Sequence, residues 1–192
     1  KGINMIIAEI GLNHLGDEIL LNKLLSNLIN TNIDSVTLQV REPEFYNNLW
    51  EDYNLKLGNE VYKEVSSVLK LSGKRFGIAL ADKNYIEFFE SIGVDFYKVI
   101  RNDIFNLDLI DRLQSTGKNI IVSTGLSSEK DINNFVEHIK YDKNFKLNHT
   151  QLSHNIEDCN LSAIDYMKRT YGLEVTFGSH CINLNVLYLS LP

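Results

Sequence analysis

Several features that would assign a chain to a common class are scarce or missing from this sequence. Its 192 residues include two cysteines, Cys159 and Cys181, whose separation matches neither a metal-binding motif nor a disulfide framework. No apolar run approaches the roughly 20 residues that cross a bilayer, and the N-terminus lacks the pattern of a signal peptide. We therefore expect a cytoplasmic protein with no membrane partner.

Positive charge and phosphate-binding glycine motifs are also scarce. Nineteen Lys and Arg residues stand against 25 Asp and Glu residues, the formal net charge is -6, and no basic block stands out. This balance argues against a nucleic-acid partner, because phosphate backbones are bound by a basic face. Neither GxGxxG nor a Walker A loop occurs, which argues against a nucleotide-binding Rossmann domain.

Apolar, β-branched runs alternate with stretches of helical period along the whole chain. The strand candidates are residues 5–10, 35–40, 75–81, 95–100, 119–124, 146–151 and 174–179. A helical stretch follows each of the first six, and four of these stretches end at a glycine, the expected C-cap residue: Gly73, Gly93, Gly117 and Gly172. This repeated β–α order predicts an α/β protein with a parallel sheet.

Two closures of such a sheet compete, an open doubly wound sheet and a (β/α)8 barrel. Polar residues recur at the carboxyl ends of the strand candidates, and these ends converge on one face only in a barrel. They are Glu9, Gln39, Lys98, Ser123, Thr124, His149 and His180. We therefore expect one domain over residues 1–192, a TIM-type barrel with seven strands visible. Because such barrels usually need about 250 residues, the eighth strand is expected to be missing.

One connection, residues 41–58, is longer than the few residues expected between a strand and its helix. It contains the only tryptophan, Trp50, among several other aromatic residues. A long aromatic loop on the active face of a barrel serves as a lid or substrate wall. The alternative interpretation is a surface excursion that packs on the barrel.

Two charged residues lie within the apolar runs. Glu9 is expensive to bury unless it is paired, so it marks either a site or a structural ion pair. Lys98, if it points into the barrel, binds an anion or forms a Schiff base. If it points outward, it is a solvated surface lysine. Strand alternation places Phe96 and Lys98 on one face but does not say which face is inside.

Hydroxyl groups follow the fifth strand candidate. Residues 123–125 read Ser-Thr-Gly just before a helix start, and together with free helix N–H groups they make a cradle for phosphate or carboxylate. The alternative is an ordinary helix cap, with Ser127 or Ser128 at the N-cap and Glu129 and Asp131 in the first turn.

The histidines are candidates for metal binding. His180 follows the seventh strand candidate and could act as a metal ligand, as a general acid or as a hydrogen-bonded structural residue. A metal site needs further ligands, and no spacing argument unites His180 with His149 or His154. His138 is expected on a helix surface.

The motif AEIGLNHLG at residues 8–16, followed in order by SVTLQV, GVDFYKV, IIVSTG, NLSAIDYMKRTYG and FGSHC, resembles the N-acetylneuraminate (sialic acid) synthase family. The resemblance implies a (β/α)8 barrel that works as a homodimer. An antifreeze-like domain often follows this barrel in the family, and we expect residues 1–192 to lack it. It also implies the condensation of phosphoenolpyruvate with an N-acetylated amino sugar to a nine-carbon 2-keto acid, in surface carbohydrate biosynthesis. A divalent metal, usually manganese, assists.

The resemblance carries roles to individual positions. Glu9 matches an active-site glutamate, and Lys98 matches a lysine that contacts phosphoenolpyruvate. Ser123, with Thr124 beside it, matches the phosphate pocket, and His180 matches a metal-binding histidine. Other matched residues of the substrate site are Asn13, His14 and Gln39.

The sequence also departs from the family pattern. Thr37 stands where the family has a lysine on phosphoenolpyruvate, and Ala79 replaces a threonine that holds the phosphate. Arg101 takes a serine position, where it could restore one charge, and Asp103 takes a glutamate position, which makes it a second catalytic candidate beside Glu9. The second metal-binding histidine of the family has no counterpart in this sequence.

These observations leave three hypotheses. The first is a divergent condensing enzyme in which Lys98, Ser123 and Arg101 hold phosphoenolpyruvate, while His180 and a missing ligand hold the metal. The second is a barrel that has lost the reaction and binds a sugar or a partner protein. The third, which the match at Lys98 disfavours, is an aldolase or lyase that uses Lys98 as a Schiff base.

Overall fold

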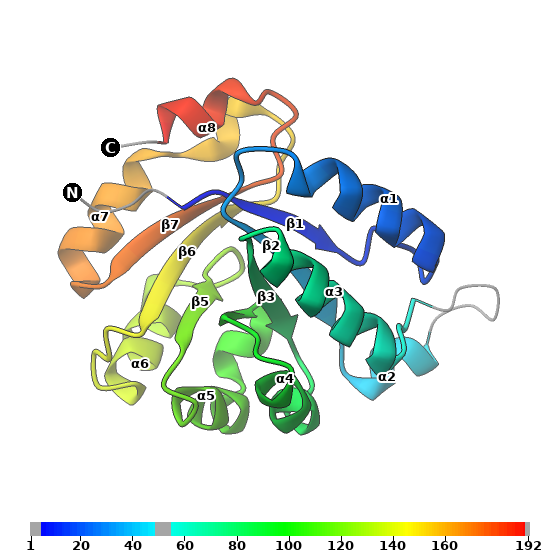
Figure 1. Ribbon diagram of the computed structural model, residues 1–192. Coiled ribbons are helices and arrows are strands. Elements are labelled where there is room, and N and C mark those ends of the chain that lie inside the picture. The colour runs from blue at the N-terminus through cyan, green and yellow to red at the C-terminus, as the bar shows by residue number, and fades with distance from the viewer. Residues whose placement is uncertain (1–4, 49–54, 191–192) are drawn as a thin grey trace. The chain divides into compact units, whose positions relative to one another are not determined.

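The structure is a computed structural model that describes residues 5–48 and 55–190. The chain divides into two compact units, residues 1–97 (unit 1) and residues 98–192 (unit 2). Seven strands lie in the described part, and a helix follows each of them in the chain (Figure 1). This order confirms the predicted α/β class. None of the described helices is both long enough and apolar enough to cross a bilayer.

Unit 1 is built on parallel strands that pair in chain order. Strand β2 pairs with β1 on one side and with β3 on the other. The elements of this unit are β1 (Ile7–Gly11), α1 (Glu18–Ile29), β2 (Ser35–Val40), α2 (Pro43–Asn47), α3 (Asn59–Leu71), β3 (Arg75–Leu80), the 3₁₀ helix η1 (Lys83–Tyr85) and α4 (Ile86–Ser91). Strand β4 (Phe96–Val99) spans the boundary of the two units.

Unit 2 repeats the same plan. Strand β6 pairs in parallel with β5 and with β7, so that Asn148 lies opposite both Ser123 and Thr176. The elements after β4 are the 3₁₀ helix η2 (Arg101–Phe105), α5 (Leu107–Gln114), β5 (Asn119–Ser123), α6 (Glu129–His138), β6 (Phe145–Gln151), the 3₁₀ helix η3 (Ile156–Cys159), α7 (Ser162–Tyr171), β7 (Glu174–Ser179) and α8 (Asn185–Leu189).

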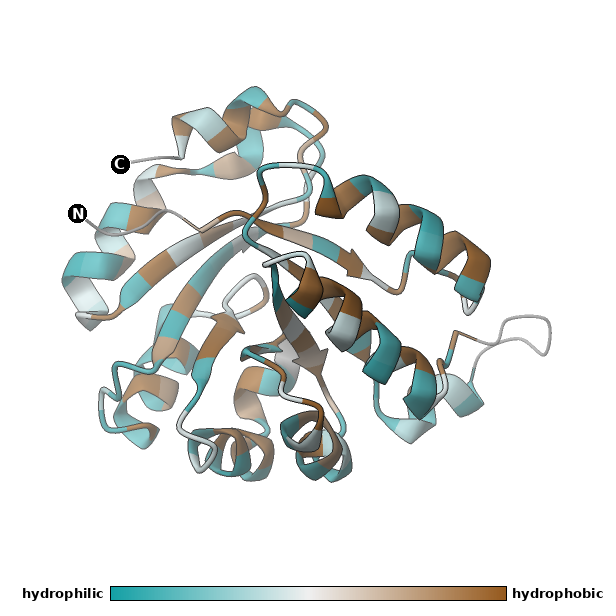
Figure 2. Cartoon of the chain, viewed as in Figure 1, coloured by the Kyte–Doolittle hydropathy of each residue, from teal (hydrophilic) through white to brown (hydrophobic). Residues whose placement is uncertain are grey.

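The helices pack through apolar stripes. Hydrophilic and hydrophobic residues alternate along α1 and α3 (Figure 2), as expected for amphipathic helices. In α3 the buried residues include Tyr62, Val65 and Leu69, and the Tyr62 ring meets the Phe89 ring of α4 edge-on with 5.3 Å between centroids. This burial of apolar surface fixes α3 and α4 in unit 1.

The predicted glycines lie at the helix ends: Gly172 is the C-cap of α7, and the other three follow the C-cap residues of α3, α4 and α5 by one or two positions. Gly73, Gly93, Gly117 and Gly172 all have left-handed φ angles, of 68°, 74°, 68° and 64°. A side chain at these positions would be strained, so glycine is the residue that ends each helix most easily. In three cases, Gly73, Gly117 and Gly172, the next strand begins two residues later.

Candidate active site

Glu9 lies on β1 directly opposite Thr37 of β2. Its side chain is exposed, so the expectation of a costly buried carboxylate is not met. Within the described residues, β1 pairs only with β2 and forms one end of the strand order. Gly11 has a φ of 56°, and a Cβ built on it would stand 3.6 Å from Gln39 Oε1 and 3.9 Å from Glu9 Cγ. Both predicted side chains therefore border Gly11.

The Asn13–His14 pair lies in the turn between β1 and α1. Asn13 is exposed, whereas His14 is fully buried. The Gly16 N–H donates to His14 Nδ1 at 2.9 Å, so the neutral ring carries its hydrogen on Nε2. Burial lowers the pKa of His14 and favours this neutral form. Nε2 is buried and has no partner among the described residues. His14 is therefore a neutral hydrogen-bond donor.

The two residues of unit 1 that depart from the family pattern, Thr37 and Ala79, are both buried. Thr37 and Ala79 are fully shielded from solvent, and the Thr37 hydroxyl has no partner in the described part of the chain. A threonine hydroxyl at this place supplies a hydrogen bond and no charge. The structure thus offers no cation at position 37.

Arg41 is a residue that the sequence analysis missed. It follows β2 immediately and its side chain is only 7% exposed, although an arginine is always charged. Its Nε and Nη2 donate to the carboxylate of Glu42 at 2.8 and 2.6 Å, and its guanidinium lies over the Phe45 ring, 4.6 Å from the centroid. The signal was an arginine directly after the strand that carries Gln39, inside the segment interpreted as a lid.

The rest of the 41–58 connection is only partly described. It contains α2 (Pro43–Asn47), which the sequence analysis did not predict, while residues 49–54 with Trp50 lie outside the described residues.

In unit 2 the candidates at the end of β4 differ in exposure. Lys98 is buried, with 8% of its surface exposed, which argues against the outward, solvated alternative. Asp103 lies half-buried in η2. Arg101 begins η2, and its side chain lies outside the described part of the structure.

Ser123 ends β5, Thr124 follows it, and both residues bond to β6. The Ser123 hydroxyl donates to Thr150 Oγ1 at 2.9 Å, and Thr124 donates from both N and Oγ1 to the Asn148 carbonyl, at 3.0 and 3.1 Å. Asn148 Nδ2 donates to Thr150 Oγ1 at 3.0 Å, and its Oδ1 accepts from Thr176 Oγ1 at 2.9 Å. A continuous polar network therefore crosses β5, β6 and β7.

The start of α6 explains the nearby serine. Ser128 is the N-cap of α6 and forms a capping box with Asp131, whose carboxylate accepts from Ser128 Oγ at 2.6 Å and from Ser128 N at 2.8 Å. These hydrogen bonds, the side-chain bond first, lower the pKa of Asp131. The predicted N-cap is confirmed, and it is separate from the hydroxyls of Ser123 and Thr124.

The histidines of unit 2 do not form a cluster. His180 is exposed after β7, and its carbonyl accepts from His154 Nδ1 at 2.8 Å. His149 bonds the Cys159 carbonyl and stacks on Phe177. His138 lies on α6 and pairs with an aspartate, in keeping with a helix-surface position.

A metal site is not completed by these residues. Within residues 5–48 and 55–190, no three His, Cys, Asp or Glu side chains gather so that they could hold a metal ion. A protein site for a catalytic metal usually supplies three ligands. Among the described residues, His180 therefore has no such neighbouring ligands.

Comparison with solved structures finds a protein with a similar fold. A solved N-acetylneuraminic acid (sialic acid) synthetase from Leptospira borgpetersenii serovar Hardjo-bovis matches with a TM-score of 0.87 and 25% identity over 98% of this chain and 69% of that chain. With the strand–helix order above, this likeness confirms the predicted fold class, an incomplete (β/α)8 TIM-type barrel with seven strands in the described residues.

Two curated relatives carry synthase names. The chain is 24% identical over 203 residues to pseudaminic acid synthase of Helicobacter pylori, covering 92% of this chain and 59% of that protein. It is 25% identical over 197 residues to N-acetylneuraminate-9-phosphate synthase of Mus musculus, covering 91% of this chain and 55% of that protein. This chain thus spans little more than half the length of the curated relatives it matches.

The family follows from a direct match. The family model described as "NeuB family" matches residues 25–191, which is most of the chain. The chain belongs to the NeuB family.

Proposed function

We propose that this chain is the barrel of an enzyme that condenses phosphoenolpyruvate with an N-acetylated amino sugar to a nine-carbon 2-keto acid, in surface carbohydrate biosynthesis. Membership of the NeuB family and the synthase names of its relatives support this reaction class. The observation that carries the proposal in the structure is buried Lys98 at the carboxyl end of β4. A cation kept out of water is retained where it binds an anion.

The proposed chemistry assigns a task to each candidate. Lys98, Ser123 and Arg101 bind the carboxylate and phosphate of phosphoenolpyruvate. The enol carbon C3 attacks the sugar aldehyde, water adds at C2, and the C–O bond to phosphate then breaks. Glu9 or Asp103 moves the protons at the aldehyde oxygen and at the attacking water. Asn13, His14, Gln39 and Thr124 complete the substrate contacts.

Further parts of the proposal concern the assembly. We propose that residues 1–192 form one barrel domain, that the protein works as a homodimer in the cytoplasm, and that manganese binds with His180 as one ligand. Sedimentation of the protein at two concentrations tests the dimer. Manganese binding measured by calorimetry on the wild type and on His180→Ala tests the metal.

The direct test is an assay of phosphate release. The protein is incubated with manganese, phosphoenolpyruvate and N-acetylmannosamine or another acetylated amino sugar, with Lys98→Met as the inactive control. We expect phosphate release that depends on the sugar and is lost in Lys98→Met. No release with any of these sugars, together with no thermal shift on adding phosphoenolpyruvate, would contradict the proposal.

One observation favours a second function. Thr37 is buried and uncharged, and Ala79 has no hydroxyl, so two groups expected to bind phosphoenolpyruvate are absent from unit 1. A barrel that binds an amino sugar, or a partner protein, without catalysis is consistent with both replacements. Calorimetric binding of N-acetylmannosamine without phosphate release in the same assay would support this second function.

A further inference from the structure

Arg41 combines charge and burial at the carboxyl end of a strand. It is the first residue after β2 and has 6% of its surface exposed. Guanidinium groups stay protonated at every pH at which proteins fold, so this side chain carries its charge into a largely dry environment. Such a group is retained only where its donors meet acceptors.

The contacts of Arg41 leave one arm of the guanidinium unused. Nε and Nη2 bind the two carboxylate oxygens of Glu42, and the flat face of the group lies on the Phe45 ring. The Arg41 backbone N–H is held separately by the Tyr46 hydroxyl at 3.1 Å. Nη1 is buried and has no hydrogen-bond partner among the described residues. Its two hydrogens therefore have no acceptor in the described part of the chain.

We propose that Arg41 is an oxyanion-binding residue whose Nη1 arm takes a carboxylate or phosphate oxygen of the ligand. Guanidinium has donors only, and its planar arrangement matches both anions. The inference rests on the proposed function, because phosphoenolpyruvate carries both groups. It adds to that function a binding residue that neither the sequence pattern nor the family resemblance assigns.

Glu42 leads the proposal to predict opposite changes in anion affinity for two substitutions. Its side chain is 37% exposed and neutralises the guanidinium through two charge-assisted hydrogen bonds. A ligand anion on Arg41 is therefore repelled by Glu42 and competes with it for the same charge. Removing the arginine charge weakens anion binding, whereas removing the carboxylate charge strengthens it. A purely structural ion pair has no such opposite effect.

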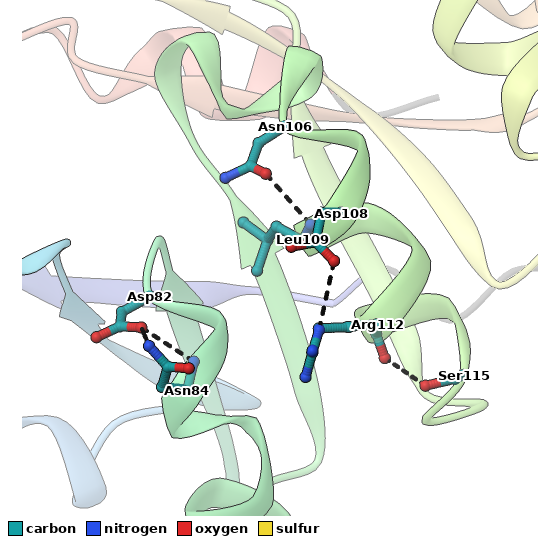
Figure 3. A network of polar contacts seen from close by, with 7 residues as sticks. All are labelled: Asp82, Asn84, Asn106, Asp108, Leu109, Arg112 and Ser115. Carbon is teal, nitrogen blue, oxygen red and sulfur yellow. Dashed lines mark hydrogen bonds and ion pairs between the residues drawn. The ribbon is translucent and has the colours of Figure 1, made fainter.

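Calorimetry on the whole chain tests this with three probes: inorganic phosphate, pyruvate and phosphoenolpyruvate. We expect Arg41→Gln to weaken binding at least fivefold, Arg41→Lys to weaken it less, and Glu42→Gln to strengthen it at least threefold. Arg112→Gln is the matched control, because Arg112 also pairs with a carboxylate, Asp108 at 3.4 Å, but on an exposed helix surface (Figure 3). The Arg112→Gln variant should bind each of the three anions with the affinity of the wild type. A response with pyruvate assigns Arg41 to the carboxylate, and a response with phosphate assigns it to the phosphate.

The outcomes separate the two proposals. If the wild type binds phosphoenolpyruvate and neither Arg41→Gln nor Glu42→Gln changes the affinity, the proposed function stands and Arg41 has no part in it. If Glu42→Gln gains no affinity for any probe, the inference is overturned whatever the wild type does. Thermal unfolding checks that each variant folds. Should Arg41→Gln fail this check, Arg41→Lys and Glu42→Gln decide the question.

Discussion

Ser123 donates its hydroxyl hydrogen to Oγ1 of Thr150, 2.9 Å away on the neighbouring strand. The Thr150 hydroxyl already uses its only hydrogen and one lone pair. It donates to the Asn148 carbonyl at 3.1 Å and accepts from Asn148 Nδ2 at 3.0 Å. A hydroxyl has one hydrogen and two lone pairs. Ser123 must therefore be the donor of the third bond, and it turns only lone pairs toward a ligand.

This arrangement predicts that Thr150→Val strengthens phosphate binding. A phosphate oxygen only accepts hydrogen bonds, so Ser123 must leave Thr150 before it can hold one. Removing the competing acceptor frees the Ser123 hydrogen, and a net hydrogen bond of about 0.5–1.5 kcal/mol corresponds to a roughly 2- to 10-fold gain in affinity. Calorimetry with inorganic phosphate measures it.

Two further variants make this result specific. Thr150→Ser keeps the hydroxyl and should bind phosphate like the wild type. In a Ser123→Ala background the gain from Thr150→Val should vanish, because it acts through the serine. An equal gain in both backgrounds would show that Ser123 is not its route.

Gly77→Ala should destabilise unit 1. A Cβ at position 77 would stand 2.3, 2.5 and 2.8 Å from three ring carbons of Phe96, whose side chain is buried. Overpacking of this kind costs about 1–3 kcal/mol, measured as the free energy of unfolding in urea. Phe96→Leu in the Gly77→Ala background should recover part of the loss, since the smaller side chain leaves the ring position. If the double variant loses the full sum of the two single effects, the contact is not the cause.

His14 should make stability depend on pH. Burial lowers its pKa in the folded state, so the unfolded chain takes up a proton more readily as the pH falls through about 6.5. The stability contributed by neutral His14 is thus full above pH 6.5 and is lost progressively below it. Asparagine at this position keeps an acceptor for the Gly16 N–H and does not titrate.

The measurement compares urea unfolding of the wild type and His14→Asn between pH 7.5 and pH 5. We expect the stability of the wild type to fall more steeply than that of the variant. Parallel curves would mean that His14 gains its proton as easily in the folded chain as in the unfolded one.

The capping box of α6 predicts different effects for two adjacent serines. Ser128→Ala removes the cap and should cost about 1 kcal/mol of unfolding free energy. It should also raise the pKa of Asp131 toward its usual value, which a carbon NMR titration of that carboxyl measures. Ser127→Ala is the control, because the Ser127 hydroxyl is buried without a partner among the described residues and its loss should be neutral or stabilising. A larger loss of unfolding free energy for Ser127→Ala than for Ser128→Ala would contradict the assignment of Ser128 as the N-cap.

Periodicity alone predicted most of the fold. Strands β2 (Ser35–Val40) and β7 (Glu174–Ser179) match the expected ranges, and the other five differ by one or two residues at one or both ends. The helix-ending glycines were readable because a left-handed residue is a property of the local chain. Helix α2 was missed because it begins at Pro43 inside a connection with no clear helical period.

The side-chain contacts were less predictable. The Ser123–Thr150 bond depends on the register of β5 against β6, and no spacing along the chain encodes that register. Glu9 was expected to be buried because its neighbours are apolar, yet its exposure depends on which strands flank β1. Arg41 was missed because an arginine near Glu42 and Phe45 in the sequence looks like an ordinary surface residue. No sequence pattern indicates that it is buried.

The segment after β6 holds His180 through its backbone. The His180 N–H donates to the Gln151 carbonyl at 3.3 Å, the His180 carbonyl accepts from the His154 ring, and the Ile182 N–H donates to the His154 carbonyl at 3.3 Å. An insertion between residues 151 and 154 would therefore displace His180, 26 residues further along the chain. Loops on barrels usually diversify freely in evolution, but this one can change length only at the expense of the histidine that it holds.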